Sequence, residues 1–251
     1  MIKLNELEIL INENLRRIPE IPLSVLLSGG IDSSLVLAFL RKVYPEITIF
    51  TFTLARSKNY PDMIYAREVA DLFQTDHNEI IISDFEYNPW HVLLTHAKKN
   101  SDIVVTGDGS DECFGGYWLH KYPLGHKETG MIKSFEEIDI APREHLKEMF
   151  DMGFRDFLFK RKSRKKDFNS VWEYYIKTIY EKQIDPLLHI ANTLGVEIYS
   201  PLYSNKIVKF MRSLPYQDRI NKKILRELAL KYLPESVVHR EKLALNAALE
   251  L

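Results

Sequence analysis

Two short stretches of the sequence combine glycines with acidic residues at a spacing that suits the binding of phosphate groups. The first, residues 28–34, reads Ser-Gly-Gly-Ile-Asp-Ser-Ser and follows an apolar run. An apolar run, a pair of glycines and then apolar residues at helical spacing predict a strand, a sharp turn and a helix. Such a turn directs free backbone N–H groups and the positive end of a helix dipole at one place, which favours phosphate.

The carboxylate of Asp32 adds a second feature to this stretch. A carboxylate beside a bound anion is favourable when a metal ion accompanies the anion, so the stretch predicts a binding site for magnesium together with a phosphate chain. The alternative is that the turn binds nothing and that Asp32 only caps the helix. The Walker pattern with its lysine and the G-x-G-x-x-G pattern are both absent, which argues against a Walker-type NTPase and a dinucleotide fold.

The second stretch, residues 106–117, reads Thr-Gly-Asp-Gly-Ser-Asp-Glu-Cys-Phe-Gly-Gly-Tyr and follows another apolar run. Its carboxylates, Asp108, Asp111 and Glu112, repel one another unless they share a cation. The alternative is an acidic, glycine-rich turn at the surface. Loops that follow parallel strands lie at one edge of the sheet, so we expect both stretches to meet there in a nucleotide–magnesium site.

These stretches resemble the motifs of one known family. Residues 28–33 are similar to the SGGxDS loop of the ATP pyrophosphatases, which make acyl-adenylates and release pyrophosphate. Residues 106–117 are similar to the GDGxDELFGGY signature of asparagine synthetase. Residues 222–242 resemble the K-x-x-L-R…Y-L-P…R-x-K segment of the same synthetase domain, to which β-lactam synthetase is related. Taken alone, this last segment reads as a cationic surface.

The resemblance implies that ATP and Mg²⁺ are used and assigns roles to individual residues. Asp32 and Asp111 would hold magnesium on the pyrophosphate, and Lys242 would reach the phosphates of the acyl-adenylate. Asp108 would lie near the reacting carboxyl group, as a second catalytic residue. The residues implied in nucleotide binding are Leu26, Ser28, Gly29, Gly30, Asp32, Ser33, Leu54, Thr106 and Gly107. Lys222 and Arg226 are weaker candidates, for which helix packing or carboxylate binding is an equal interpretation.

The implied activity is that of an AMP-forming carbon–nitrogen ligase. It would adenylate a carboxylate, aspartate in the first place, and then transfer ammonia or an amine to give an amide such as asparagine. The middle of the chain departs from the family pattern, because Tyr199 replaces an arginine and Ser204 an aspartate, and residues 118–170 do not align. Adenylation is therefore better supported than aspartate as the substrate.

Two alternatives stay open at this stage. The chain could adenylate another metabolite or an RNA base, which the replaced Tyr199 and the basic run at 160–166 favour slightly. It could also be a nucleotide-binding subunit that works with a separate glutaminase. No nucleophilic N-terminal cysteine of a glutaminase domain precedes the first loop, so nitrogen would arrive as ammonia, as an amine or from such a partner.

Composition limits the remaining possibilities. The 251 residues are 45% hydrophobic and 27% charged, enough for one good core or two small lobes. A formal charge of −1 gives no overall attraction to nucleic acid or membranes, and the basic run at 160–166 is typical of a solvated loop. The single cysteine, Cys113, excludes internal disulfides, and we expect it to be a packed thiol. Without a signal peptide at the start or an apolar run of about 18 residues, we expect a cytoplasmic protein.

The pattern of elements must place these loops. Strands alternate with helices up to residue 106, which predicts a doubly wound α/β fold with a parallel sheet and right-handed crossovers. The resemblance specifies the adenine nucleotide alpha-hydrolase-like PP-loop fold. We expect this ATP-binding lobe to span residues 1–123 and a mainly helical lobe without strands to span 124–251, with Lys242 returning to the ATP site. The predicted helices are 4–17, 60–73, 90–97 and one directly after the first loop with its apolar positions between 35 and 43, and the predicted strands are 22–27, 47–54, 77–82 and 102–106.

Overall fold

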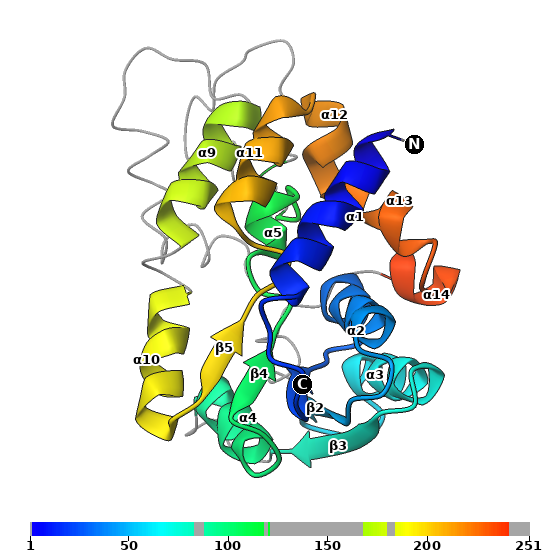
Figure 1. Cartoon of the computed structure of the whole chain (residues 1–251), viewed down its shortest axis with the longest axis vertical. Coiled ribbons are helices and arrows are strands. Elements are labelled where there is room, and N and C mark those ends of the chain that lie inside the picture. Colours follow the sequence, from blue (N-terminus) through cyan, green and yellow to red (C-terminus); the bar gives the residue numbers. More distant parts are fainter. Residues whose placement is uncertain (1, 83–87, 118–119, 121–167, 180–183, 241–251) are drawn as a thin grey trace, which may run out of the picture.

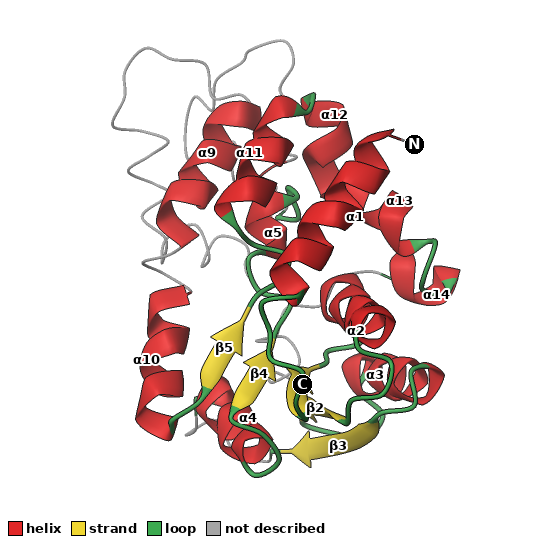
Figure 2. Cartoon of the chain, in the orientation of Figure 1, coloured by secondary structure: helices red, strands yellow, loops and turns green. Residues whose placement is uncertain are grey.

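A computed structural model of the chain describes residues 2–82, 88–117, 120, 168–179 and 184–240. Their centre is a five-stranded parallel sheet with the strand order β3-β2-β1-β4-β5 (Figures 1 and 2). The predicted doubly wound α/β fold is confirmed. The strands are β1 Leu23–Leu26, β2 Ile49–Ala55, β3 Asp76–Ile81, β4 Ile103–Val105 and β5 Glu197–Tyr199. The α-helices are α1 Ile2–Leu15, α2 Ile31–Val43, α3 Pro61–Leu72, α4 Pro89–Lys98, α5 Ser110–Cys113, α9 Phe168–Ile179, α10 Asp185–Leu194, α11 Asn205–Ser213, α12 Tyr216–Arg219, α13 Lys223–Ala229 and α14 Glu235–Val238, with a 3₁₀ turn η3 at Ile220–Lys222.

The order of the strands places the loops that matter. The chain builds β1, β2 and β3 outward in one direction and then returns to the other side of β1 with β4. In register, Val25 of β1 lies beside Val105 of β4, so these two strands end next to each other. Ligands of open parallel sheets bind outside the carboxyl ends of the strands at such a reversal of order. The stretches at 28–34 and 106–117 begin at this position.

Helices cover both faces of the sheet, and each face has its own core. On one side α4 and α10 pack against the sheet through a cluster that includes Leu94, Val104 and Ala191. On the other side α2 and α3 pack on β1 and β2, with Phe39 and Val69 fully buried. Burial of these apolar faces is what holds the helices on the sheet, because about 25 cal/mol is gained per Å² removed from water.

The core of the second face continues into the helical part of the chain. Helix α1 contacts α2 and also α11 and α13, with Leu7, Ile11 and Leu15 buried at helical spacing. The side chain of Asn14 donates a hydrogen bond of 2.9 Å to the carbonyl oxygen of Pro201. One apolar cluster therefore joins elements from both ends of the sequence. The proposed boundary at residue 123 lies outside the described residues, and the division 1–123 and 124–251 stays a prediction.

One expectation about the second half of the sequence is wrong. No strand was predicted after residue 124, yet β5 pairs in parallel with β4 and completes the sheet. The strand is three residues long and lies at the edge, partly exposed, so it carries no alternation that a sequence pattern could reveal. No helix among the described residues has the length and apolar character needed to span a membrane.

Candidate functional site

The loop after β1 is shaped by its first glycine. Gly29 has a φ of +66°, and a Cβ there would collide with the backbone of α3 at Tyr65 and Ala66. Only glycine fits a left-handed conformation pressed so closely against another backbone. The loop is closed by Ser33, whose Oγ accepts a hydrogen bond of 3.1 Å from the backbone N–H of Ser28. The loop thus has a fixed shape at the N-terminus of α2.

Helix α2 begins after Gly30, which is its N-cap residue and makes no side-chain capping bond. Asp32 lies in the first turn of the helix, where its negative charge is favourable to the helix dipole. Its carboxylate does not cap the helix but turns outward, and Oδ1 accepts a hydrogen bond of 2.6 Å from the hydroxyl of Ser110. The alternative that Asp32 serves only as a cap is therefore wrong.

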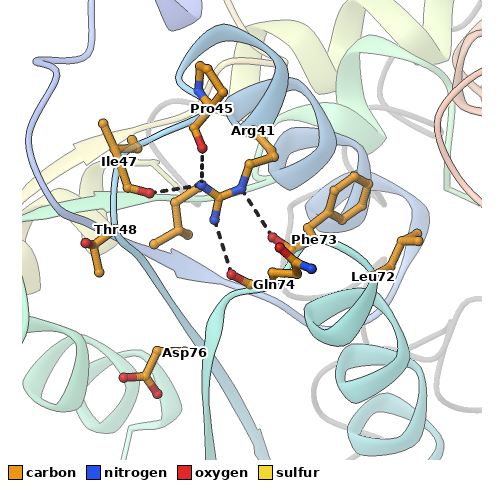
Figure 3. A pocket seen from close by; sticks show the side chains of 9 residues that line it. Arg41, Pro45, Ile47, Thr48, Leu72, Phe73, Gln74 and Asp76 are labelled. Carbon is orange, nitrogen blue, oxygen red and sulfur yellow. Dashed lines mark hydrogen bonds between the residues drawn. The ribbon is translucent and has the colours of Figure 1, made fainter.

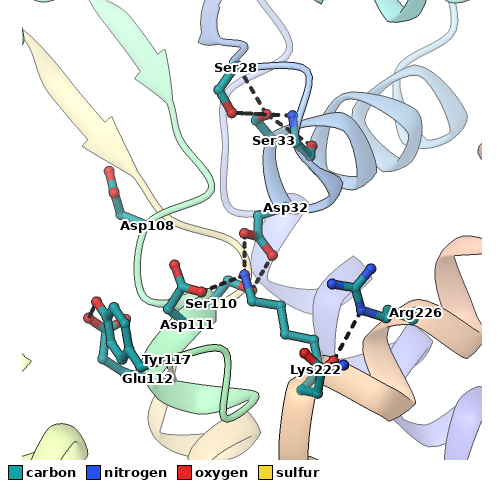
Figure 4. Close-up of polar contacts among 12 residues, drawn as sticks. Ser28, Asp32, Ser33, Asp108, Ser110, Asp111, Glu112, Tyr117, Lys222 and Arg226 are labelled. Atoms are coloured by element: carbon teal, nitrogen blue, oxygen red, sulfur yellow. Dashed lines mark hydrogen bonds and ion pairs between the residues drawn. The ribbon is translucent and has the colours of Figure 1, made fainter. Parts of the chain in front are cut away.

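The second loop packs directly on the first. Gly107 leaves no room for a side chain, since a Cβ there would lie 2.9 Å from the backbone nitrogen of Ser33 and 3.0 Å from Cβ of Asp32. Gly109, with a φ of +82°, then turns the chain into α5, which carries Ser110 and Asp111. The structure brings the two predicted loops together at one edge of the sheet (Figure 4).

Lys222 joins the carboxylates of the two loops. Its Nζ forms ion pairs with Asp32 and, at 2.7 Å, with Oδ1 of Asp111 (Figure 4). The side chain of Lys222 is 3% exposed, whereas those of Asp32 and Asp111 are 20% and 17% exposed. The ammonium group is thus buried beneath two carboxylates that reach the surface. Sequence reasoning ranked Lys222 among the weaker candidates, and the structure places it at the centre of the site.

The backbone around Lys222 explains how a buried lysine reaches this position. Asn221 and Lys222 both adopt left-handed conformations with φ of 57°, which is uncommon for residues other than glycine. Their backbone N–H groups donate hydrogen bonds of 2.9 Å to the carbonyl oxygens of Gly115 and Phe114. The turn after α5 therefore holds the turn before α13. Gly116 completes the contact, because a Cβ there would overlap the side chains of Asp111 and Lys222.

Arg226 has a structural role in the same segment. Its Nε donates a hydrogen bond of 3.1 Å to the carbonyl oxygen of Asn221, and its terminal nitrogen contacts the carbonyl oxygen of Val238. Of the two roles considered for Arg226, the packing of the helix is the one these contacts support. The guanidinium connects the turn that carries Lys222 to the end of α14.

The other acidic residues of the second stretch are directed elsewhere. Asp108 points away from the Asp32–Lys222–Asp111 cluster (Figure 4), and its backbone N–H donates a 3.2 Å hydrogen bond to the hydroxyl of Thr106. Glu112 is buried and accepts a 2.6 Å hydrogen bond from the hydroxyl of Tyr117. Of the three carboxylates expected to share one cation, only Asp111 lies in the cluster. There it shares the ammonium group of Lys222 with Asp32.

The remaining predicted residues line the ends of the strands or lie outside the described part. Leu26 and Leu54 are buried near the carboxyl ends of β1 and β2. The backbone N–H of Thr106 donates a 2.9 Å hydrogen bond to the carbonyl oxygen of Tyr199. Cys113 is fully buried, and burial raises the pKa of its thiol well above the usual value, which confirms a packed thiol. Lys242 and the basic run at 160–166 lie outside the described residues.

Arg240, which sequence reasoning did not single out, lies against the first loop. It donates a 3.1 Å hydrogen bond to the carbonyl oxygen of Ser28, forms a buried ion pair with Asp62 and stacks 4.6 Å from the ring centre of Tyr65. Burial raises the pKa of the Asp62 carboxyl, although Arg240 acts in the opposite direction. The only signal in the sequence was the place of Arg240 in the R-x-K part of the third motif.

The donor set of the site can be tested against magnesium. Among the described residues, no group of three or more histidine, cysteine or acidic side chains is arranged to hold a metal ion. Mg²⁺ commonly binds through one or two carboxylates and completes its octahedron with water and substrate phosphates. The pair of Asp32 and Asp111 therefore fits a magnesium ion that arrives with a phosphate chain, and does not fit a cage made of protein ligands alone.

A hollow of about 400 Å³ at the opposite edge of the sheet is unrelated to this site (Figure 3). It lies where β2 and β3 begin, and the guanidinium of Arg41 crosses it. Arg41 donates hydrogen bonds to the carbonyl oxygens of Pro45 and Ile47, at 2.9 Å each, and of Phe73, at 3.2 Å. These contacts connect the end of α2 to the end of α3, so the role of Arg41 is structural.

Comparison with known proteins identifies the family of the chain. The model of the Asparagine synthase family matches residues 14–87 and 86–250, which is most of the chain. The chain belongs to the asparagine synthase family. The matched residues correspond to the ATP pyrophosphatase domain of that family, whose members use ATP.

The similarity to individual family members is partial. Over 154 residues the chain is 31% identical to the glutamine-hydrolysing asparagine synthetase of Homo sapiens, which covers 49% of this chain and 27% of that protein. The corresponding synthetase 2 of Oryza sativa is 33% identical over 149 residues, covering 45% and 25%, and synthetase 1 of Bacillus subtilis is 26% identical over 139 residues, covering 47% and 21%. These matches span about a quarter of the length of those relatives.

Among solved structures, the chain resembles the U34-tRNA thiolase NcsA from Methanococcus maripaludis. The TM-score is 0.38 with 12% identity, over 84% of this chain and 88% of that chain.

Proposed function

We propose that this chain is an AMP-forming carbon–nitrogen ligase that activates a carboxylate by adenylation. One observation carries the proposal: Asp32, in the loop at 28–34, contacts Ser110 and Lys222, and Lys222 also pairs with Asp111. These contacts lie beyond the carboxyl ends of β1 and β4, where the strand order of the sheet reverses. An oxygen of the substrate carboxylate attacks the α-phosphorus of ATP, and the bond to the bridging oxygen breaks to release pyrophosphate. An amine nitrogen then attacks the acyl carbon, AMP leaves, and the amine loses a proton.

The residues of the chain act mainly by positioning and by neutralising charge. The loop formed by Ser28, Gly29 and Gly30 leads into α2, and the positive end of the dipole of this helix favours the phosphates. Asp32 and Asp111 are the residues that would hold magnesium, which when bound neutralises charge on the leaving pyrophosphate. Lys222 supplies a buried positive charge beside them.

Lys242 and Asp108 complete the proposed catalytic residues. Support for Lys242 comes from the third motif and from Arg240, two positions earlier, which is fixed to the first loop at Ser28. A cation at Lys242 would stabilise the charge that develops on the α-phosphate as pyrophosphate leaves. Support for Asp108 comes from its place in the second motif and from its position after β4, where it points away from the Asp32–Lys222–Asp111 cluster.

The simplest substrates are aspartate and ammonia, which would give asparagine. The test is incubation of the pure chain with MgATP and ammonium, with and without aspartate, with measurement of pyrophosphate and AMP. Aspartate-dependent release of both products is expected. Release of ADP and phosphate would contradict adenylation, and activity that appears only with an added glutaminase would assign the chain to a subunit of a larger enzyme.

Variants connect this activity to the site. Lys242→Ala is expected to lower the rate of pyrophosphate release by at least about 100-fold, the typical loss when one group that stabilises developing charge is removed. Lys98→Ala is the matched control, because Lys98 lies on α4 and pairs with Asp102 at 2.5 Å, away from the site. Equal rates for Lys242→Ala and the parent chain would contradict the role of Lys242.

A second candidate is adenylation of a carboxylate other than aspartate, and Tyr199 favours it. Tyr199 ends β5 beside Val105 of β4, and its hydroxyl donates a 2.6 Å hydrogen bond to Glu197. This bond, together with burial and the charge of Glu197, raises the pKa of the Tyr199 phenol to about 12. A neutral phenol therefore occupies the position where the family has an arginine cation. A panel of carboxylates in the same pyrophosphate assay separates the two candidates. If the second candidate is right, aspartate causes no release of pyrophosphate and another carboxylic acid does.

A further inference from the structure

Lys222 shows a feature that nucleotide binding alone does not require. A lysine that only met phosphates could extend from the surface, as lysines usually do. Lys222 is instead 3% exposed and pairs with both Asp32 and Asp111, the residues proposed to hold the metal. Its ammonium group therefore lies in the position between the carboxylates that a divalent cation would compete for.

The backbone also indicates that this position is imposed. Asn221 and Lys222 are held in consecutive left-handed conformations, which are uncommon outside glycine and least expected at a residue such as lysine. The hydrogen bonds to Gly115 and Phe114 and the contact with Gly116 maintain the turn. Strain that the surroundings maintain at a polar cluster points to a function of that conformation.

We propose that Lys222 is a built-in substitute for the metal cation. It holds Asp32 and Asp111 together before nucleotide binds, opposes the entry of a free divalent cation, and gives up the carboxylates only when the cation arrives with a phosphate chain that accepts the ammonium group. The metal ion and the nucleotide then bind together, as one complex. This inference rests on the proposed function in one respect, that the site takes a metal–nucleotide complex.

The charges give the physical reason. Two carboxylates that face one point repel each other, and an ammonium group between them removes that repulsion. A free divalent cation would have to approach with the positive charge of Lys222 already in place, and like charges about 4 Å apart oppose each other strongly in a partly buried site. The negative phosphates of a nucleotide offer the ammonium new partners and so remove this opposition.

The test measures binding of Mn²⁺, as a spectroscopic probe for the divalent cation, to the pure chain without nucleotide. Lys222→Gln is expected to bind Mn²⁺ at least about tenfold more tightly than the parent chain, since the competing charge is gone. Lys223→Gln is the control, because it removes the same charge from the next residue, whose side chain is 53% exposed and about 4 Å from its acidic partners. It is expected to bind Mn²⁺ like the parent.

A double variant shows where the ion binds. Asp111→Asn in the Lys222→Gln background is expected to abolish the gain in affinity. Lys222→Met, which keeps the length of the side chain without its charge, is the second variant, and Mn²⁺ is expected to raise its midpoint of urea unfolding more than that of the parent. The inference is overturned if the Lys222 variants bind Mn²⁺ no better than the parent chain.

Failure of this inference and failure of the proposed function are distinguishable. Mn²⁺ binding is measured without any substrate, so tighter binding by Lys222→Gln supports the cation substitute even in a chain that releases no pyrophosphate. A parent chain that releases pyrophosphate and AMP, together with unchanged Mn²⁺ affinity in Lys222→Gln, overturns the substitute alone.

Discussion

At the scale of single residues, Gly116 is a position where the site has no room for any side chain. A methyl group there would overlap Asp111 and Lys222, and its φ is not in the left-handed region, so the substitution acts on the ion pair more than on the backbone. Gly116→Ala is expected to lower the rate of pyrophosphate release by about 100-fold, because displacements of about 1 Å at a site have effects of that size. The measurement is the pyrophosphate assay together with urea unfolding.

Gly195→Ala is the matched control for this prediction. Gly195 ends α10 with a φ of +64°, and a Cβ there would meet only Lys98, at 3.5 Å. It is expected to lower the free energy of unfolding by about 1–2 kcal/mol, the cost of a left-handed alanine, and to leave the rate unchanged. A Gly116→Ala chain with full activity would show that the Lys222–Asp111 contact is not needed.

The sequence predicted the acidic part of the cluster better than the basic part. Asp32 and Asp111 were expected to meet because each follows a strand of one parallel sheet, and the structure brings them together through Ser110 and Lys222. Their role as magnesium ligands stays a prediction. The position of Lys222 could not be predicted from the neighbouring sequence. It depends on the left-handed conformations of Asn221 and Lys222, and such conformations are expected from sequence mainly at glycines.

At the scale of elements, Arg226 is expected to act as a positioning residue for the segment from η3 to α14. Arg226→Gln removes the charged donor that holds the carbonyl oxygens of Asn221 and Val238. Loss of hydrogen bonds from a charged group is expected to lower the free energy of unfolding by about 1.5–3 kcal/mol. Because the turn carries Lys222, Mn²⁺ affinity without nucleotide is also expected to change, a result that loss of stability alone would not give.

Arg67→Gln is the control for this change. Arg67 on α3 forms an ion pair of 2.5 Å with Glu79 while 45% of its side chain is exposed, and such pairs contribute about 0–1 kcal/mol. It is expected to leave Mn²⁺ affinity unaltered. Arg226→Gln with parental Mn²⁺ affinity would mean that the turn at Lys222 holds its shape without this clamp.

The elements of the first half were predictable because their signals are local. Apolar runs, prolines and glycines located the four strands and four helices up to β4 within a few residues, as at Pro61, the first residue of α3. The edge strand β5 was missed because three residues are too few to show an alternation of apolar and polar side chains. Its pairing with β4 is also a contact between residues about 90 positions apart in the sequence. Long-range pairing is the part of the fold that local patterns do not contain.

At the scale of the whole molecule, the stability of the fold is expected to depend on pH through buried His120. It is fully buried beside the rings of Tyr117, Phe168 and Tyr175, and burial lowers its pKa to about 3. Between that value and the ordinary histidine pKa near 6.5, the unfolded chain binds a proton that the folded chain does not. The contribution of neutral, buried His120 to the free energy of unfolding is therefore fully present above about pH 6.5 and is lost progressively as the pH falls toward 3.

The expected size of this loss is about 1 kcal/mol between pH 6 and pH 5, because one proton taken up on unfolding gives a slope of up to about 1.4 kcal/mol per pH unit. His120→Phe keeps an aromatic ring among aromatic neighbours and removes the titrating group, so its urea-unfolding free energy is expected to fall less over this interval. Other groups titrate in both proteins, such as Asp62, whose raised pKa acts in the opposite direction, and their effects cancel in the difference. Since His120 lies between the second loop and α9, equal slopes in the two chains would mean that this junction opens to water before the fold is lost.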